Sequence, residues 1–332
     1  MNSFGTVFRI SIFGESHGNG IGAVLDGTPP GIPLSESDME ADLRRRMPGG
    51  EGTTARREPD VPEILSGVYR GFTTGAPLAV LFRNKDAQSS AYDRFTETPR
   101  PGHADLTARN KYQGFNDPRG SGHFSGRITL ALVAAGVVAK KIVPGLSVES
   151  EVLAIGGVKD YAEKLKEAVA GGDSLGGLIE VRINRMPAGL GEPFFDSFES
   201  VLAHLVLSVP AVRGIEFGTG FAAASMKGSE HNDPIVATDG RTATNHAGGI
   251  NGGITNGNSV VFRVAVKPTP SIHKAQETIN LATGSTETLE VTGRHDACIA
   301  LRAPVVFEAC AAIAAADMYL VNRAIYKQEI IL

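Results

Sequence analysis

The chain has 332 residues, of which 42% are apolar and 20% charged, and its formal net charge is −4 at pH 7. These are ordinary values for a globular protein, and no block of Lys and Arg indicates a nucleic acid or an anionic membrane as partner. Cys298 and Cys310 have neither the number nor the spacing of a disulfide framework or a metal site. With no secretory-signal pattern at the N-terminus, we expect a protein of a reducing compartment, the cytoplasm.

Glycine is the compositional excess, with 40 residues and no collagen period, which predicts many tight turns and close backbone approaches. In residues 5–25 apolar and polar side chains alternate as in a half-buried strand interrupted by Gly14 and Gly18. The polar triplet Glu15-Ser16-His17 lies between these glycines. Glycine-flanked turns at strand ends often carry functional side chains, so this turn is a candidate site.

A capping sequence at residues 35–38 predicts a helix that ends before Pro48. Met39 and Leu43 are spaced to share its buried face, and Arg46 projects from the edge of that face. The preceding pair, Arg44-Arg45, is expected to be solvated and to favour the helix C-terminus.

The remaining elements alternate between strands and helices. Strands are predicted at residues 64–69, 79–82, 178–183, 214–217 and 260–266, and helices at residues 128–143, 161–170, 198–207 and 304–321. Glycine-spaced residues 119–127 lead into the first long helix, where free N–H groups with Ser125 and Arg127 would form an anion seat. A similar glycine, histidine and arginine cluster precedes the last helix. This echo suggests two similar halves, about 1–145 and 146–332, sharing one core within a single domain of residues 1–332.

The last helix contains Glu308 and Asp317, which argue against a membrane anchor. The longest uncharged apolar run, residues 128–139, is shorter than the ~20 residues that cross a bilayer. Both segments are expected to be core helices.

The histidines separate into two groups by their surroundings. His204 falls in an apolar helical pattern and His231 and His273 in polar loops, which indicates packing or surface roles. Glycine or a tight polar turn surrounds His17, His103, His246 and His295. None of the histidines has the spacing or cysteine partners of a zinc site, and the chain contains no serine-hydrolase elbow, Walker loop or Rossmann loop in its required context. No metal is therefore expected.

Four arginines stand in or beside glycine-rich turns or helix ends: Arg46, Arg100, Arg127 and Arg294. One such arginine is usually a structural ion-pair partner. Four of them, with neighbouring histidines and Asp296, are better explained by a polyanionic small molecule, because a guanidinium can fork onto carboxylate or phosphate oxygens. A histidine near neutral pH can also donate a proton to a leaving phosphate.

Four blocks together resemble the signature blocks of one family, the chorismate synthases, in order and spacing. They are Phe13-Gly14-Glu15-Ser16-His17-Gly18, Arg100-Pro101-Gly102-His103-Ala104-Asp105, Asn245-His246-Ala247-Gly248-Gly249-Ile250 and Gly293-Arg294-His295-Asp296. The resemblance covers essentially the whole chain. It implies an α+β fold, a β-α-β sandwich with long helices between two four-stranded antiparallel sheets, assembled as a homotetramer. The implied activity is that of a lyase of the shikimate pathway and aromatic amino acid biosynthesis: an anti 1,4-elimination of phosphate from 5-enolpyruvylshikimate 3-phosphate, which gives chorismate. Reduced FMN is required without net redox change.

The resemblance also implies roles for matching positions. His17 would protonate the departing phosphate, His103 would stabilise the reduced flavin, and Asp296 would help to take the substrate proton. The implied substrate-binding residues are Ser16, Arg46, Arg100, Ser125, Arg127 and Arg294. The implied FMN-binding residues are His123, Phe124, Ser125, Pro210, Ala211, Asn245, Gly252, Lys267, Pro268, Thr269, Pro270, Ser271 and Arg294. Cations are needed because an electron-rich flavin beside a trianionic substrate is electrostatically unfavourable.

Two departures and three alternatives stay open at this point. The loop after Arg46 lacks an arginine that relatives place there, for which Arg56 or Arg57 would substitute, and an insertion of longer members is missing. A flavin reductase or other FMN-dependent oxidoreductase acting on a phosphorylated small molecule would use the same glycine loops. A non-catalytic binding protein for a phosphorylated ligand would use the same arginines. NADPH is a candidate reductant of the flavin, the alternative being an outside source of electrons.

Overall fold

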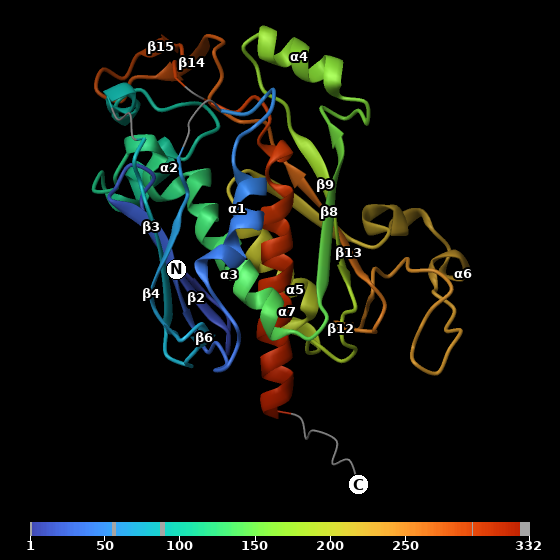
Figure 1. Ribbon diagram of the computed structural model, residues 1–332. Helices are drawn as coiled ribbons and strands as arrows, with labels where there is room; N and C mark the ends of the chain where they lie inside the picture. The colour runs from blue at the N-terminus through green and yellow to red at the C-terminus, as the bar shows by residue number, and fades with distance from the viewer. Residues whose placement is uncertain (1, 55–57, 87–89, 294, 326–332) are drawn as a thin grey trace.

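The protein is a three-layer sandwich in which helices lie between two antiparallel sheets (Figure 1). The computed structural model describes residues 2–54, 58–86, 90–293 and 295–325. The expected β-α-β fold is thus confirmed. Arg56, Arg57 and Arg294 lie outside the described residues.

The first sheet is built entirely from the N-terminal part of the chain. Its spatial order is β1 (Ser3–Phe4), β2 (Arg9–Gly14), β3 (Gly20–Asp26), β7 (Leu78–Arg83) and β4 (Pro62–Ser66). Four strands were expected, and the two-residue β1 adds a fifth. A hairpin of β5 (Val68–Tyr69) and β6 (Phe72–Thr73) extends from its end, because the strand predicted over residues 64–69 is interrupted at Gly67, where φ is +84°.

The second sheet has the four strands expected. Its order is β10 (Val212–Phe217), β13 (Val260–Val266), β9 (Gly177–Asn184) and β8 (Ser147–Ile155), all antiparallel. Strand β8 was not predicted. It lies at the sheet edge, where Glu149 and Glu151 face solvent and break up its apolar pattern.

Four helices fill the space between the sheets: α1 (Glu40–Arg46), α3 (Thr129–Ile142), α5 (Phe198–Ser208) and α7 (Pro304–Ile325). Helices α3 and α7 pack so closely that a Cβ on Gly136 would lie 2.4 Å from the Cβ of Ala309. Residues 304–324 are long and apolar enough to span a membrane, but 78% of their most apolar window is buried in the protein. Figure 1 shows α7 running through the middle of the sandwich, as expected of a core helix.

Both acidic residues of α7 are buried and partnered. Asp317 accepts hydrogen bonds from the backbone N–H groups of Thr6, Val7 and Phe8 at 2.8–2.9 Å, which fixes the N-terminal segment. Glu308 accepts a hydrogen bond of 2.7 Å from Nη1 of Arg45. Arg45 is exposed, as predicted for a solvated residue, but its guanidinium group also reaches this buried carboxylate, which the sequence did not predict.

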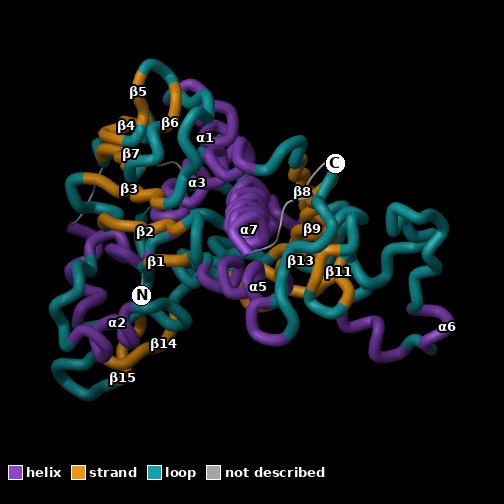
Figure 2. Tube along the Cα trace, turned by 90° about the horizontal axis from the view of Figure 1, so that it is seen from below, coloured by secondary structure: helices purple, strands orange, loops and turns teal. Residues whose placement is uncertain are grey.

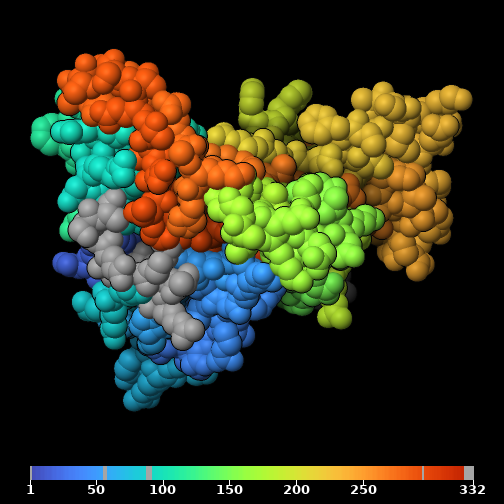
Figure 3. Space-filling view, turned by 90° about the horizontal axis from the view of Figure 1, so that it is seen from above, coloured from blue at the N-terminus to red at the C-terminus, as the bar shows by residue number. Residues whose placement is uncertain are grey.

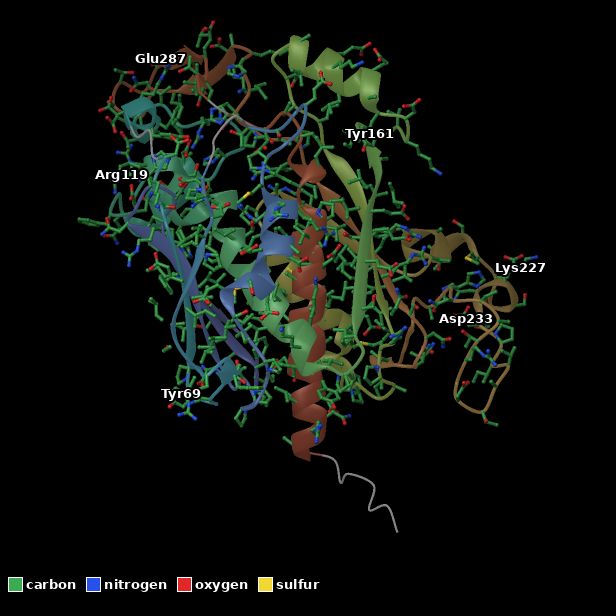
Figure 4. The ribbon with its side chains drawn as sticks, viewed as in Figure 1. Tyr69, Arg119, Tyr161, Lys227, Asp233 and Glu287 are labelled. Carbon is green, nitrogen blue, oxygen red and sulfur yellow. The ribbon has the colours of Figure 1, made fainter. Side chains whose placement is uncertain are left out.

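Smaller elements surround the sandwich. They are α2 (Asp105–Tyr112), α4 (Ala162–Ala170), α6 (Gly228–His231), the hairpins β11 (Ile250–Asn251) with β12 (Ile254–Thr255) and β14 (Gln276–Ile279) with β15 (Thr286–Leu289), and the 3₁₀ segments η1 (Glu36–Met39), η2 (Ser90–Thr96), η3 (Arg119–Phe124), η4 (Gly126–Ile128), η5 (Phe194–Asp196), η6 (Gly220–Ser225) and η7 (Ile299–Leu301). Figure 2 shows α7 between the two sheets, with α6 far out on one side. Lys227 and Asp233 mark this projecting arm in Figure 4.

Segments distant in sequence meet at one end of the molecule. In Figure 3 the β14–β15 region adjoins the region of α2. The segment after α1 contacts the segment before α7, since the carbonyl of Gly52 accepts from the N–H groups of Ala297 and Cys298. The first sheet comes from residues 3–83 and the second from residues 147–266, but the two-halves interpretation remains a prediction. Superposition of residues 1–145 on residues 146–332 would test it.

Candidate active site

A cavity of about 930 Å³ lies where α1 ends and where α3 and α7 begin. Small-molecule pockets usually measure about 300–1,000 Å³, so this one has room for more than one small ligand. It is lined by predicted site residues from all parts of the chain: Ser16, His17, Arg46, Arg100, His103, His123, Phe124, Ser125, Arg127, Pro210, Ala211, Lys267, Thr269, Pro270, Ser271 and Asp296. The glycine turns therefore converge on one cavity.

His17 is held in the turn between β2 and β3, and only 8% of it is exposed. The backbone N–H of Ser16 donates to the carbonyl of Gly122 at 3.0 Å, which ties this turn to η3. A Cβ on Gly120 would lie 2.4 Å from Cδ2 of His17, so only glycine permits this approach. The ring of Tyr92 packs edge-on against His17, with 5.2 Å between ring centroids. The imidazole is thus fixed at the cavity wall.

Arg46 and Arg127 lie on either side of a buried carboxylate, Asp60. Nη1 of Arg127 donates to Oδ1 of Asp60 at 2.8 Å, and Nη1 of Arg46 lies 3.7 Å from Oδ2. Nε of Arg127 donates to Oδ1 of Asn84 at 2.7 Å, and Nε of Arg46 to Oγ1 of Thr129 at 3.1 Å. Both guanidinium groups are therefore held by protein acceptors.

Two buried carboxylates face the two guanidinium groups, because Oε2 of Glu58 lies 3.9 Å from Nη2 of Arg127 in addition to the contacts of Asp60. Burial first, and then Arg302 and Arg127, lower the pKa of Arg46 from 12.5 to about 9, while Asp60 and Asp296 oppose the shift. Nη2 of Arg127 is buried and has no hydrogen-bond partner among the described residues. A bound anion would supply the missing hydrogen-bond acceptor.

Arg100 and His103 belong to a second network around Asp105. Arg100 donates to both oxygens of Asp105 at 2.8 Å and to Oγ of Ser271 at 3.0 Å. Nδ1 of His103 lies 2.6 Å from Oδ1 of Asp105, and Nε2 lies 3.1 Å from Oγ of Ser121. Most N–H groups of Arg100 thus serve the protein itself, and its predicted contact with substrate remains a prediction.

The charges of this network fix protonation states. Burial alone would raise the pKa of Asp105, but hydrogen bonds from Arg100 and His103 outweigh it and hold the pKa well below its ordinary value. Burial lowers the pKa of His103, and the hydrogen bond to Asp105 opposes this. Near neutral pH the pair is therefore an ionised carboxylate beside a neutral imidazole.

Asp296 is tied to the start of α7 and to the loop after α1. Nε and Nη2 of Arg302 donate to its two oxygens at 3.1 and 2.7 Å, and the N–H of Thr54 donates to Oδ1 at 3.0 Å. A carboxylate has about four lone-pair sites, so the described residues leave one site on Oδ2 open. Asp296 thus has both an anchoring function and room for one further proton.

Some predicted cofactor residues are not brought to the cavity. Asn245 and Gly252 do not line it, since both lie beyond the second sheet, where Nδ2 of Asn245 donates to the carbonyl of Ser259 at 2.8 Å. Pro268 is adjacent to the lining but not part of it. The position of these three residues gives no support to the predicted contact with a cofactor, which stays a prediction.

Three buried polar atoms of cavity residues have no hydrogen-bond partner among the described residues: Nη2 of Arg127, Oγ1 of Thr269 and Nε2 of His295. Buried polar groups are normally satisfied, so these atoms fit a cavity that receives a polar ligand. They are compatible with a phosphorylated cofactor and a phosphorylated substrate. Among the described residues, no three His, Cys, Asp or Glu side chains gather as a metal site would require.

The sequence did not identify five lining or supporting residues: Asp60, Tyr92, Asp105 as a partner of His103, Ser121 and Arg302. Asp105 and Ser121 lie within blocks already singled out, so their proximity to histidine was a usable signal. Asp60 carried no signal, because only the folded chain places its loop against Arg127.

A cavity with clustered guanidinium groups and two fixed imidazoles indicates an enzyme of the α+β class that acts on an anionic small molecule. The family model for chorismate synthase matches residues 8–320. A chorismate synthase of Chitinophaga pinensis is 57% identical over 324 residues, covering 97% of this chain and 98% of that protein. One of Korarchaeum cryptofilum is 46% identical over 346 residues, covering 95% and 96%.

A solved structure described as the crystal structure of chorismate synthase has a TM-score of 0.74 and 30% sequence identity, covering 96% of this chain and 93% of that one. The chain belongs to the chorismate synthase family. Its activity is accordingly that of a carbon–oxygen lyase in aromatic amino acid biosynthesis, and the FMN-dependent oxidoreductase is not favoured.

Proposed function

We propose that the chain converts 5-enolpyruvylshikimate 3-phosphate to chorismate by anti 1,4-elimination of phosphate, with reduced FMN bound in the same cavity. The observation that carries this proposal is the pair Arg46 and Arg127 around Asp60, with Nη2 of Arg127 buried, 3.9 Å from Oε2 of Glu58 and without a hydrogen-bond acceptor among the described residues. A substrate phosphate or carboxylate would supply that acceptor.

His17 is the proposed acid for the departing phosphate. Its ring lies at the wall of the cavity that Arg127 also lines, and Gly120 and Tyr92 prevent it from turning away. A proton delivered from a fixed imidazole avoids the cost of a free phosphate trianion leaving a buried site. Ser16 and Ser125 supply hydroxyl groups at the same wall.

When bound, reduced FMN supplies transient electron density to the breaking C–O bond without net oxidation. The proposed contacts come from His103, from His123 to Ser125, from Pro210-Ala211, and from Lys267 with Thr269 to Ser271, which line one continuous cavity. His103 holds a neutral imidazole beside Asp105 at this wall. Asp296 is proposed to assist removal of the substrate proton through its open lone pair on Oδ2.

Assembly as a homotetramer and a cytoplasmic location are also proposed. Phe194, Phe195 and Phe221, whose exposed fractions are 85–93%, are candidate contacts of such an assembly. Light scattering at several protein concentrations would test the tetramer. Comparing NADPH consumption with an external photoreductant would test NADPH as the source of electrons.

The decisive assay is chorismate and phosphate formation under anaerobic conditions with photoreduced FMN. The proposal predicts one phosphate per chorismate over many turnovers, while the flavin stays reduced. The variants His17→Ala, His103→Ala and Asp296→Ala should each be strongly impaired, whereas His231→Ala, on the arm remote from the cavity, should not. Stoichiometric NADPH oxidation would instead indicate an oxidoreductase, and binding without phosphate release a binding protein.

A further inference from the structure

The turn that precedes η4 has an unusual backbone. Gly120, Ser121 and Gly122 follow one another with φ angles of +58°, +69° and +52°. Glycine adopts these angles readily, but a serine at +69° is strained by its Cβ. Strained residues of this kind persist where the surrounding structure holds them, and they cluster at functional sites.

This turn contacts both histidines of the site. Gly120 lies against the ring of His17, and the carbonyl of Gly122 accepts the N–H of Ser16. Ser121, between the two glycines, places its Oγ 3.1 Å from Nε2 of His103. The turn starts at the surface, where Arg119 is exposed beside Asp117 (Figure 4), and runs inward from there.

The direction of each hydrogen bond in the network follows from its neighbours. Asp105 is an ionised carboxylate that can only accept, so Nδ1 of His103, 2.6 Å away, carries the hydrogen. Nε2 of the neutral ring then has a lone pair. Because Nε2 can then only accept, Ser121 donates its hydroxyl hydrogen to that lone pair, while its oxygen accepts from Nη2 of Arg100 at 3.2 Å.

We propose that Ser121 is a positioning residue that holds His103 as the neutral tautomer, with hydrogen on Nδ1 and with Nε2 fixed by the serine hydroxyl. Glycine would avoid the backbone strain at this position but would provide no hydroxyl group to contact His103. An effect of Ser121 on turnover rests on the catalytic role proposed above for His103. The assignment of the His103 tautomer does not depend on that role.

The groups facing His103 determine what loss of this hydroxyl does. Asp105 favours the protonated ring, whereas burial, Arg100 and Lys267 oppose it. Ser121 favours the neutral form, because its oxygen already accepts from the positively charged Arg100 and is therefore a poor acceptor for a second cationic N–H, whereas its hydrogen is free to be donated to a ring lone pair. Removing the hydroxyl group therefore raises the pKa of His103 and loosens its ring.

Two variants separate the hydroxyl group from the backbone strain. Ser121→Gly removes both, so its melting temperature should equal or exceed that of the parent. Ser121→Ala removes the hydroxyl group but keeps the Cβ at positive φ, so it should melt lower. If the hydroxyl is what matters, the two variants share one defect at His103 despite their opposite changes in stability.

Two-bond ¹H–¹⁵N NMR spectra of protein labelled at histidine nitrogen report tautomer and pKa directly, with the His103 signals assigned by a His103→Gln variant. We expect the parent to show the Nδ1–H tautomer and both Ser121 variants to show an upward shift of the His103 pKa. An unchanged pKa and tautomer in Ser121→Gly would overturn the proposal.

Turnover with photoreduced FMN then tests the link to catalysis. Loss of one net hydrogen bond of about 0.5–1.5 kcal/mol corresponds to about a twofold to tenfold lower kcat in both variants, with little change in KM. If kcat falls in Ser121→Ala, which melts lower, but not in Ser121→Gly, the loss of activity follows stability. That result would contradict positioning by the hydroxyl group. A shifted His103 pKa with unchanged kcat counts against the catalytic role of His103 and leaves the assignment of Ser121 supported.

Discussion

Gly120→Ala is the substitution whose effect on the site follows most directly from the geometry. The new Cβ would lie 2.4 Å from Cδ2 and 2.5 Å from Nε2 of His17, whereas ordinary contacts begin near 3.4 Å. The imidazole must therefore retreat by roughly 1 Å, and a misplacement of that size costs about 100-fold in rate. The φ of +58° adds a backbone penalty of about 1 kcal/mol, which affects stability rather than turnover.

The assay is anaerobic kcat with photoreduced FMN, together with the melting temperature. Gly71→Ala is the matched control: its φ is +79°, and nothing lies within 4 Å of the added Cβ. Both variants should lose stability through the backbone, Gly120→Ala the more because of its clash, but only Gly120→Ala should lose activity. If Gly120→Ala keeps more than about a third of the parental kcat, His17 does not need the position that the structure gives it.

Three further outcomes follow from buried groups. Asp317→Ala leaves three backbone N–H groups without their acceptor, so denaturant unfolding should reveal a loss of about 3–6 kcal/mol, and an unchanged midpoint would contradict it. Gly136→Ala, normally stabilising in a helix by about 1 kcal/mol, should lower the melting temperature here because Ala309 occupies the space. Burial lowers the pKa of His295 from 6.5 to about 4. Between these two values the unfolded chain binds a proton at His295 that the folded protein does not bind. The free energy of unfolding should therefore fall by about 3 kcal/mol as the pH drops from 6.5 to about 4. His295→Gln should flatten this decline in a series of melts, and an equal decline would exclude His295 as its cause.

Periodicity located the elements whose burial is one-sided or complete. The predicted helix over residues 128–143 is observed at residues 129–142, and the strand over residues 178–183 at residues 177–184. The edge strand β8 was not predicted, because a strand with solvent on one side and half-buried residues on the other has little apolar alternation. The arrangement of layers came from the family resemblance, since periodicity specifies elements but not which sheet they join.

Candidate site residues could be predicted where chemistry and backbone constraint coincide in one turn. His17 and His103 stand beside glycines that the turns require, so local sequence marks them. Asp60 could not be found this way, because it acts through Arg46 and Arg127, which are distant in sequence. Its φ of +46° is set by the folded loop and leaves no mark in the amino-acid pattern.

The central claim is that Arg46, Arg127 and His17 converge on one phosphorylated substrate. A crystal structure with 5-enolpyruvylshikimate 3-phosphate and oxidised FMN, which does not support turnover, tests it most directly. The account predicts the substrate in this cavity, with an anionic oxygen within about 3 Å of Nη2 of Arg127 and the phosphate within reach of the His17 ring. A substrate bound elsewhere, with Nη2 of Arg127 still without a hydrogen-bond acceptor, would contradict it.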